Sequence, residues 1–143
     1  MHITLETDYA IRIVECLAVS GRKMDAADIS VKTDVSQRFA LKILRKLVHS
    51  GIIKSYKGAQ GGYELALPPE KITLRTVVEA VEGPYHFSRC LSDDYRCSHA
   101  DGACGERICS CRFRGVYDKI SVMVRDELDK VNFGMAAEAR SSQ

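Results

Sequence analysis

Five of the six cysteines of this 143-residue chain lie close together, between positions 90 and 111. Thiolates are common ligands of iron–sulfur clusters and of zinc, so these residues could hold a metal. Successive cysteines are separated by six, six, four and one residues. Structural zinc sites favour cysteines with two to four residues between them, a spacing that only Cys104 and Cys109 have. A thiol–disulfide switch is the third possibility, although Cys109 and Cys111 are too close in sequence for an easy bridge.

The composition is that of a soluble globular protein, with 45% hydrophobic and 28% charged residues. No apolar run is long enough for a membrane span, and charged residues interrupt the N-terminal apolar pattern where a secretory signal would be unbroken. We therefore expect a cytoplasmic protein without a membrane partner. Disulfides are rare in that compartment, and clustered cysteines there more often bind metal or carry out redox chemistry.

Catalytic motifs are missing from the sequence. It contains no nucleophile–base pair, no phosphate-binding loop and no zinc-protease motif. We therefore expect no enzymatic activity and no small-molecule substrate.

Positive charge is concentrated in residues 22–63, which hold nine Lys or Arg against three Asp. Such an excess indicates an anionic partner, with nucleic acid the first candidate. A solvated surface without a partner gives the same composition. The two interpretations can therefore be distinguished only by the structural elements on which these charges lie.

The apolar spacing predicts a mainly α fold with one hairpin. Caps and glycines mark the ends of the elements. The expected elements are helices between Thr4 and Gly21, from Asp25 to about Thr33, between Ser36 and Gly51 and from Thr73 to Gly83, a hairpin over 52–67, and a long helix from near Cys111 to about Asn132.

Helix, short helix, helix and hairpin is the element order of a winged helix-turn-helix. The third helix would enter the major groove of double-stranded DNA with its N-terminal residues against the bases, and the wing would reach the neighbouring backbone or minor groove. The competing interpretation is a core helix with a charged outer face. The candidate DNA-binding residues are Ser36, Gln37, Arg38, Lys42, Lys54, Lys57, Gly61 and Gly62.

Several short motifs together resemble the IscR/NsrR/RirA-type (Rrf) family of bacterial winged-helix regulators. They are Gly61-Gly62-Tyr63, Leu65-Ala66-Leu67, Pro68-Pro69, Ile72-Thr73-Leu74 and Glu82-Gly83, and the similarity covers about residues 1–133. Two departures indicate a different operator sequence. The wing opens with Lys57-Gly58-Ala59-Gln60 where the family commonly has Arg-Gly-Pro-Gly, and Leu41 stands where a glutamate is often found.

The resemblance implies an iron–sulfur cluster (4Fe-4S or 2Fe-2S) held by three cysteines. Cys90 and Cys111 match the first and last ligands, Cys104 is the first choice for the middle one, and Cys97 is the alternative, with Cys109 last. Thr7-Asp8-Tyr9-Ala10 resembles the branch in which an aspartate of the partner subunit is the fourth ligand, which implicates Asp8. A fourth cysteine, His86 and His99 compete for that role, and Asp8 could instead complement the dipole of its helix.

Three regions follow from these observations: a winged helix-turn-helix DNA-binding domain over 1–83, a cysteine-rich cluster-binding loop over 84–111, and a dimerisation helix with its tail over 112–143. The long helix has an apolar side that it cannot cover alone, which predicts a homodimer that reads a pseudo-palindromic operator. This apolar side consists of Phe113, Tyr117, Ile120, Val124 and Val131. Cys16 is expected to be a small buried hydrophobic residue.

The resulting hypothesis is a transcriptional repressor whose cluster senses iron, nitric oxide, oxygen or redox state. One alternative keeps the winged helix but replaces the cluster with a structural zinc or a thiol–disulfide switch. A second is a regulator that responds to a protein or metabolite, as in the cysteine-metabolism branch of the family. A third is a cluster-bearing electron carrier or redox enzyme, which would show no salt-dependent binding to duplex DNA.

Overall fold

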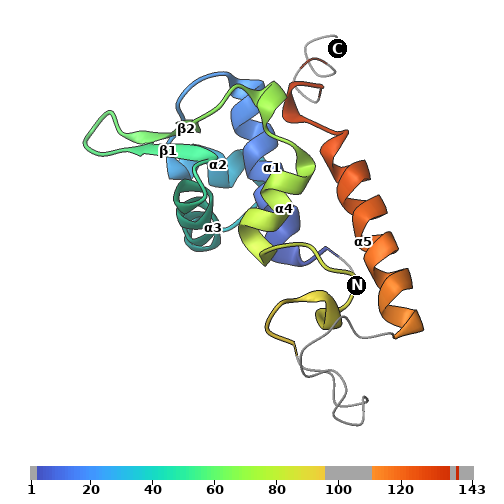
Figure 1. Cartoon of the computed structure of the whole chain (residues 1–143). Coiled ribbons are helices and arrows are strands. Elements are labelled where there is room, and N and C mark those ends of the chain that lie inside the picture. Colours follow the sequence, from blue (N-terminus) through green and yellow to red (C-terminus); the bar gives the residue numbers. More distant parts are fainter. Residues whose placement is uncertain (1–2, 96–110, 136–137, 139–143) are drawn as a thin grey trace.

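The computed structural model describes residues 3–95, 111–135 and 138 of the chain. Helices dominate this part, which confirms the predicted mainly α fold class (Figure 1). The elements are α1 (Leu5–Ser20), α2 (Ala26–Thr33), α3 (Gln37–His49), β1 (Ile53–Tyr56), β2 (Gly62–Leu65), the 3₁₀ turn η1 (Pro69–Lys71), α4 (Leu74–Glu82), the 3₁₀ turn η2 (Arg89–Leu91) and α5 (Arg112–Asp129).

The helix ends follow local capping chemistry. Thr4, Asp25 and Thr73 precede α1, α2 and α4, and each side chain accepts a hydrogen bond from the backbone N–H three residues later. Ser36 precedes α3 as predicted, but its side chain makes no such bond. Gly21 ends α1 in the left-handed conformation, with φ at 60°, and its N–H is bonded to the last turn. The predicted ends of the first four helices are therefore confirmed.

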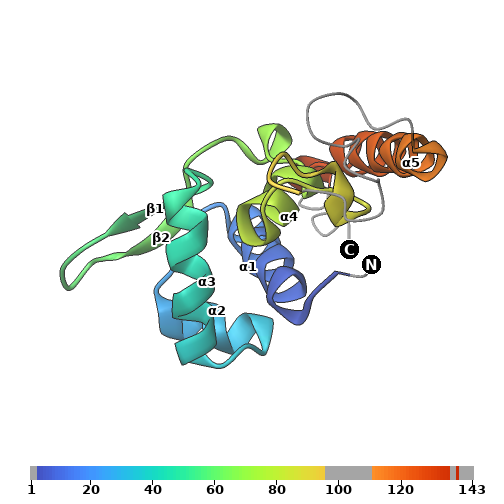
Figure 2. The same ribbon diagram turned by 60° about the horizontal axis from the view of Figure 1, so that its bottom comes forward.

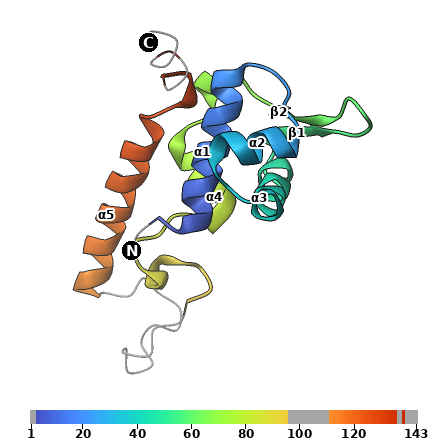
Figure 3. The same ribbon diagram turned by 180° about the vertical axis from the view of Figure 1, so that it is seen from behind.

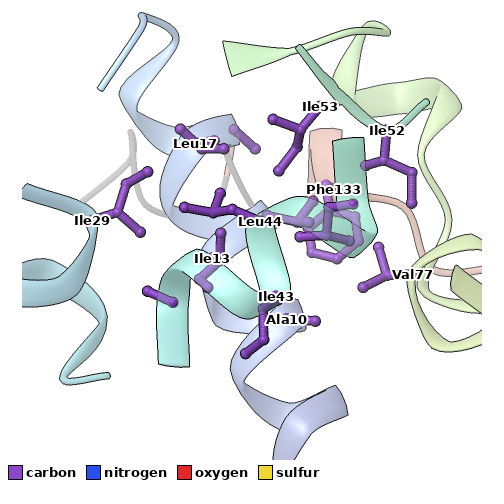
Figure 4. Packing of buried hydrophobic residues seen from close by; sticks show 14 of the residues in the cluster. Ala10, Ile13, Leu17, Ile29, Ile43, Leu44, Ile52, Ile53, Val77 and Phe133 are labelled. Carbon is purple, nitrogen blue, oxygen red and sulfur yellow. The ribbon is translucent and has the colours of Figure 1, made fainter. Parts of the chain in front are cut away.

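One hydrophobic core joins the winged-helix elements (Figure 4). Ile13 of α1, Ile29 of α2, Leu44 of α3, Ile53 of β1 and Val77 of α4 are all buried and belong to a single cluster. Burying a side chain of this size contributes about 1.5–3 kcal/mol relative to leaving it exposed. The relative positions of α1, α3 and the wing are therefore fixed by shared packing.

The wing is a hairpin of β1 and β2, with Ile53 opposite Leu65 at its base. A third segment joins it, because the backbones of Met24 and Tyr63 exchange two hydrogen bonds of 2.8 and 2.9 Å. Gly62 lies against this bridge with φ at +141°, and a Cβ there would be 2.6 Å from the carbonyl oxygen of Met24. A side chain at this position would therefore break the base of the wing.

Helix α5 lies on the side of the molecule opposite the wing (Figures 1 and 3). It ends at Asp129, whereas the prediction placed its end at about Asn132. The reason is a backbone connection to the start of α4. The N–H of Leu74 donates to Val131 O at 2.8 Å, and the N–H of Phe133 donates to Ile72 O at 3.1 Å. The chain leaves the helical path so that Phe133 can enter the core, where it is 5% exposed.

In the described ranges, every helix is too short or too polar to cross a membrane.

We expect Gly62→Ala to lower the free energy of unfolding by about 2–3 kcal/mol, because it combines backbone strain with a steric clash against Met24. Thermal and denaturant unfolding measure this change. Gly58→Ala is the matched control, since Gly58 also has a positive φ, 96°, but open space around its Cβ position. Equal losses at the two sites would show that the contact with Met24 has no steric importance.

Candidate nucleic-acid interface and cysteine site

The outer face of α3 is rich in cations. Ala40, Ile43, Leu44 and Leu47 turn to the core, which leaves the opposite side of the helix to solvent. Gln37, Arg38, Lys42 and Arg45 are exposed there. No ion pair found in the described residues involves Arg38 or Arg45, so both guanidinium groups are available to an anion.

The wing lies beside α3, and both are on the side away from α5 (Figure 2). Lys54 of β1 and Lys57 just after it are exposed, as a role in backbone contact requires. A hollow of about 270 Å³, lined in part by Arg45, His49 and Ser55, lies between α3 and the wing. The predicted DNA-binding residues of the helix and of the wing therefore come from adjacent elements.

The two wing glycines have a structural requirement of their own. Gly62 must be small because of Met24, and a Cβ on Gly61 would collide with the carbonyl oxygen of Tyr56. Ser36 and Gln37 are exposed at the start of α3, where backbone N–H groups lack helical partners. Contact between DNA and any of these four residues stays a prediction.

The first turn of α1 is linked to α3 by charge. Glu6 Oε1 lies 3.3 Å from Lys42 Nζ and 3.0 Å from Lys46 Nζ. Lys46 Nζ also donates to Val81 O of α4 at 3.4 Å. Partial burial acts to raise the pKa of Glu6, but the two ammonium groups outweigh it and leave the pKa below its usual value. No local pattern in the sequence predicts this link, because Glu6 and the two lysines are 36 or more positions apart.

The same turn is linked to the end of α4. The hydroxyl groups of Thr4 and Thr7 both donate to Glu82 Oε1, and Thr7 is fully buried. These two hydrogen bonds hold the pKa of Glu82 below its usual value, against the opposing effects of burial and of the nearby Glu6 carboxylate. The sequence shows Glu82 only as part of a Glu-Gly motif, whereas the structure gives it two hydroxyl donors.

Asp8, the predicted fourth ligand, is paired with its own helix. Its Oδ2 lies 2.8 Å from Arg12 Nη2 one turn later, and both side chains are about half exposed, at 45% and 50%. An acid placed four residues before a base on a helix is a favourable but weak pair, worth about 0.3–0.5 kcal/mol. Such a pair leaves the carboxylate able to change partner.

Two of the predicted cysteine ligands lie in the described residues, and the turn η2 that carries one of them packs against α5, which begins just after the other. Cys90 is half-buried in η2, Cys111 is exposed immediately before α5, and both thiols are free. Arg114, in the first turn of α5, donates from Nη1 to Cys90 O at 2.5 Å. The N–H of Phe87 donates to Ser121 Oγ at 2.9 Å and fastens the same segment about two turns further along α5.

The remaining predicted ligands, Cys97 and Cys104, and also Cys109 and His99, lie outside the described residues. Within the described ranges, no three His, Cys, Asp or Glu side chains gather as a metal site. Cys90 and Cys111 nevertheless fit a thiolate-ligated group, because both are free and their segments are held together through Arg114.

Cys16 is half-buried rather than fully buried. It packs against the core cluster, and its Sγ lies 4.0 Å from Met24 Sδ. A hollow of about 640 Å³ between α1 and α2 exposes part of it. The hydrophobic role is therefore correct and the full burial is not.

The apolar side of α5 divides in two. Tyr117, Ile120 and Val124 are half-buried, and the ring of Tyr117 lies 5.6 Å from that of Phe87. Large apolar side chains remain exposed along the helix and just beyond it, namely Phe113, Val116, Val122, Met123 and Val131. Part of the predicted side thus packs on the protomer itself, and an apolar surface is still left uncovered.

We expect Glu82→Gln to lower the free energy of unfolding at neutral pH by about 0.5–1 kcal/mol, a modest loss because solvent screens this exposed carboxylate. The depressed pKa adds stability that is present at neutral pH and is lost as the pH falls below about 4.3. The variant should therefore lose less stability between neutral and acid pH than the unmodified chain. Denaturant unfolding at both pH values measures this difference.

Thr7→Val is the matched control, since it removes one donor while keeping the shape of the buried side chain. In that background the effect of Glu82→Gln should shrink. If the losses of unfolding free energy caused by the two substitutions simply add, the role given to this hydrogen bond is contradicted.

Comparison with known proteins supports the architecture. A candidate HTH-type transcriptional regulator of Haemophilus influenzae is 33% identical over 93 residues, which are 64% of this chain and only 62% of that protein's own length. The structure is similar to CymR, the global cysteine regulator of Bacillus subtilis, with a TM-score of 0.72, 22% identity and coverage of 97% of this chain and 98% of that chain. It is also similar to T. potens IscR, with a TM-score of 0.71, 20% identity and coverage of 100% and 91%.

These likenesses confirm the winged-helix fold. The Rrf2 family, described as iron-dependent transcriptional regulators, matches residues 3–138. Because that match spans nearly the whole chain, the protein belongs to the Rrf2 family, a family of transcriptional regulators rather than enzymes.

Proposed function

We propose that this chain is a homodimeric DNA-binding transcriptional repressor whose operator binding is controlled by an iron–sulfur cluster. The observation that carries the DNA-binding part is the outer face of α3. Arg38 and Arg45 are exposed and without an ion pair in the described structure, on a helix next to the wing. Cations in this position neutralise phosphates and can read base edges in the major groove.

The proposed DNA contacts begin at the start of α3. Ser36, Gln37 and Arg38 would meet bases or phosphates there, and Lys42 would lie against the backbone. Lys54 and Lys57 would extend the contact from the wing. Gly61 and Gly62 would act through the shape of the hairpin, which both residues are needed to form.

The proposed cluster ligands are Cys90, Cys104 and Cys111, with Cys97 as the alternative middle ligand and Asp8 of the partner subunit as the fourth. Two free thiols whose segments are joined through Arg114 support the first and last of these. When bound, the cluster (4Fe-4S or 2Fe-2S) would supply an iron centre that reacts with iron-, oxygen- or nitric-oxide-linked signals. The half-exposed carboxylate of Asp8 would have to leave Arg12 to join it.

The first turn of α1 would pass the signal to the DNA-reading helix. Asp8 shares this turn with Glu6, which contacts α3, and with Thr7, which contacts α4. A movement of Asp8 toward the cluster would therefore disturb the contacts that position α3. Two discrete arrangements of this turn would favour different affinities for DNA.

The proposed dimer forms through α5. Its uncovered apolar residues are a surface that a second copy of the chain would cover. The regions 1–83, 84–111 and 112–143 are then functional divisions: reading, sensing and dimerisation. The last of them is not structurally separate, since Phe133 packs in the core of the first.

A cluster-free regulator is the second candidate. The similarity to CymR favours it, because that protein has the same fold and is named for cysteine regulation. In this case the cysteines would hold a structural zinc or form a thiol–disulfide switch. Metal content separates the candidates directly.

We expect Arg38→Ala to weaken binding to a duplex selected by the unmodified protein from a random pool by roughly tenfold to a hundredfold. Fluorescence anisotropy at several salt concentrations measures both affinity and salt slope. Arg125→Ala on α5 is the control of the same residue type and should change binding less than about twofold. Salt-independent binding, or equal effects of the two substitutions, would exclude α3 as the reading helix.

We expect protein purified without oxygen to be coloured and to contain iron and sulfide. Cys90→Ala and Cys111→Ala should both lose the absorbance and most of the iron, whereas Cys16→Ala should keep them. Absorption spectra with iron, sulfide and zinc analysis measure this. Colourless protein that contains zinc, or no metal, would remove the cluster from the proposal, and equal DNA affinity with and without the cluster would remove the switch.

A further inference from the structure

We infer that Glu6 is a built-in competitor of the DNA backbone for the lysines of α3, and that it sets how tightly this chain holds DNA. The inference rests on the proposed DNA-binding function and adds a residue that limits it. Glu6 belongs to α1, outside the predicted reading surface, yet its carboxylate contacts two of the cations on α3.

The geometry makes Glu6 a shared counter-ion. A single oxygen, Oε1, lies 3.3 Å from Lys42 Nζ and 3.0 Å from Lys46 Nζ. The carboxylate is more enclosed than the lysines, with 20% of its side chain exposed against 56% for Lys42 and 37% for Lys46. The anion is therefore held in place by α1, while the ammonium group of Lys42 reaches it from the solvent side.

The contact is ionic rather than directional. No hydrogen bond of normal geometry reaches Glu6 Oε1 from any described residue, although both ammonium groups are within ion-pair distance. Half-exposed ion pairs of this kind are worth at most about 1 kcal/mol. A DNA phosphate, which carries a full charge and releases condensed counterions on binding, can replace the carboxylate at Lys42.

The two lysines are not equivalent. Lys46 has a second acceptor in Val81 O of α4, at 3.4 Å, which ties it to the body of the protein. Lys42 has only Glu6 as an ionic partner in the described structure, and its cation also lies 5.4 Å from the ring centre of Phe39. Lys42 is thus the cation that moves between Glu6 and a phosphate, and Arg38 and Arg45 bind without this competition.

The test uses the full-length protein and a short random-sequence duplex, so no operator is needed. Glu6→Gln keeps the shape and removes the charge, and should raise affinity at low salt roughly threefold to tenfold. The slope of log K against log salt should steepen by about 0.9 for each additional phosphate contact. Glu6→Ala, which also removes the carboxylate but favours a helix, should act in the same direction.

Two controls distinguish competition for Lys42 from a general effect of net charge on DNA affinity. Glu127→Gln makes the same change in net charge on α5, where Glu127 pairs with Lys130, and should alter affinity less than about twofold. In a Lys42→Gln background the gain from Glu6→Gln should disappear. A gain that persists there would mean simple repulsion between Glu6 and DNA and would overturn the inference.

Unchanged or weaker binding by a folded Glu6→Gln protein, checked by thermal unfolding, would also overturn it, because Glu6 would then organise the lysines for DNA. Failure of the unmodified chain to bind any duplex would refute the proposed function itself. That outcome differs from one in which the unmodified chain binds DNA and Glu6→Gln leaves its affinity unchanged.

Discussion

The first turn of α1 is the constraint on which the arrangement of the molecule depends. Three consecutive polar side chains have different partners there. Glu6 faces α3, Thr7 is buried against Glu82 of α4, and Asp8 faces outward to Arg12. A helix turn places neighbouring residues about 100° apart, so one turn contacts three surroundings. Helix α3, helix α4 and the outer surface are thereby tied to one short piece of backbone.

Helix α5 adds a second connection, between the region proposed to sense and the region proposed to read DNA. Its C-terminal end is joined to the start of α4 by backbone hydrogen bonds, and Asp129 contacts both Arg75 and Thr73 there. Its first turn and its middle are held to the cysteine segment through Arg114 and Ser121. The segment that would hold the cluster is thus fastened to α5, while α3, the helix proposed to read DNA, lies on the far side of the core (Figure 1).

Local chemistry was readable in the sequence, and long-range pairing was not. Caps such as Thr4 and Asp25 and the left-handed Gly21 act through their own neighbours, so the first four helices and the wing could be predicted. The links of Glu6 to Lys42 and of Thr7 to Glu82 join residues 36 or more positions apart, and depend on how helices pack. The early end of α5 has the same cause, because residues 131–133 pair with residues 72–74.

The position of Phe133 has a consequence for assembly. This residue follows α5 and completes the core of the winged-helix unit, so the helix that we propose as the dimer contact is anchored in the domain that it would connect to a second copy. In the proposed dimer, subunit association and tertiary folding would be thermodynamically coupled, because contacts that order α5 would also hold the last piece of the protomer's interior in place. Dilution to monomers would loosen the DNA-reading head itself as well as separate the two heads.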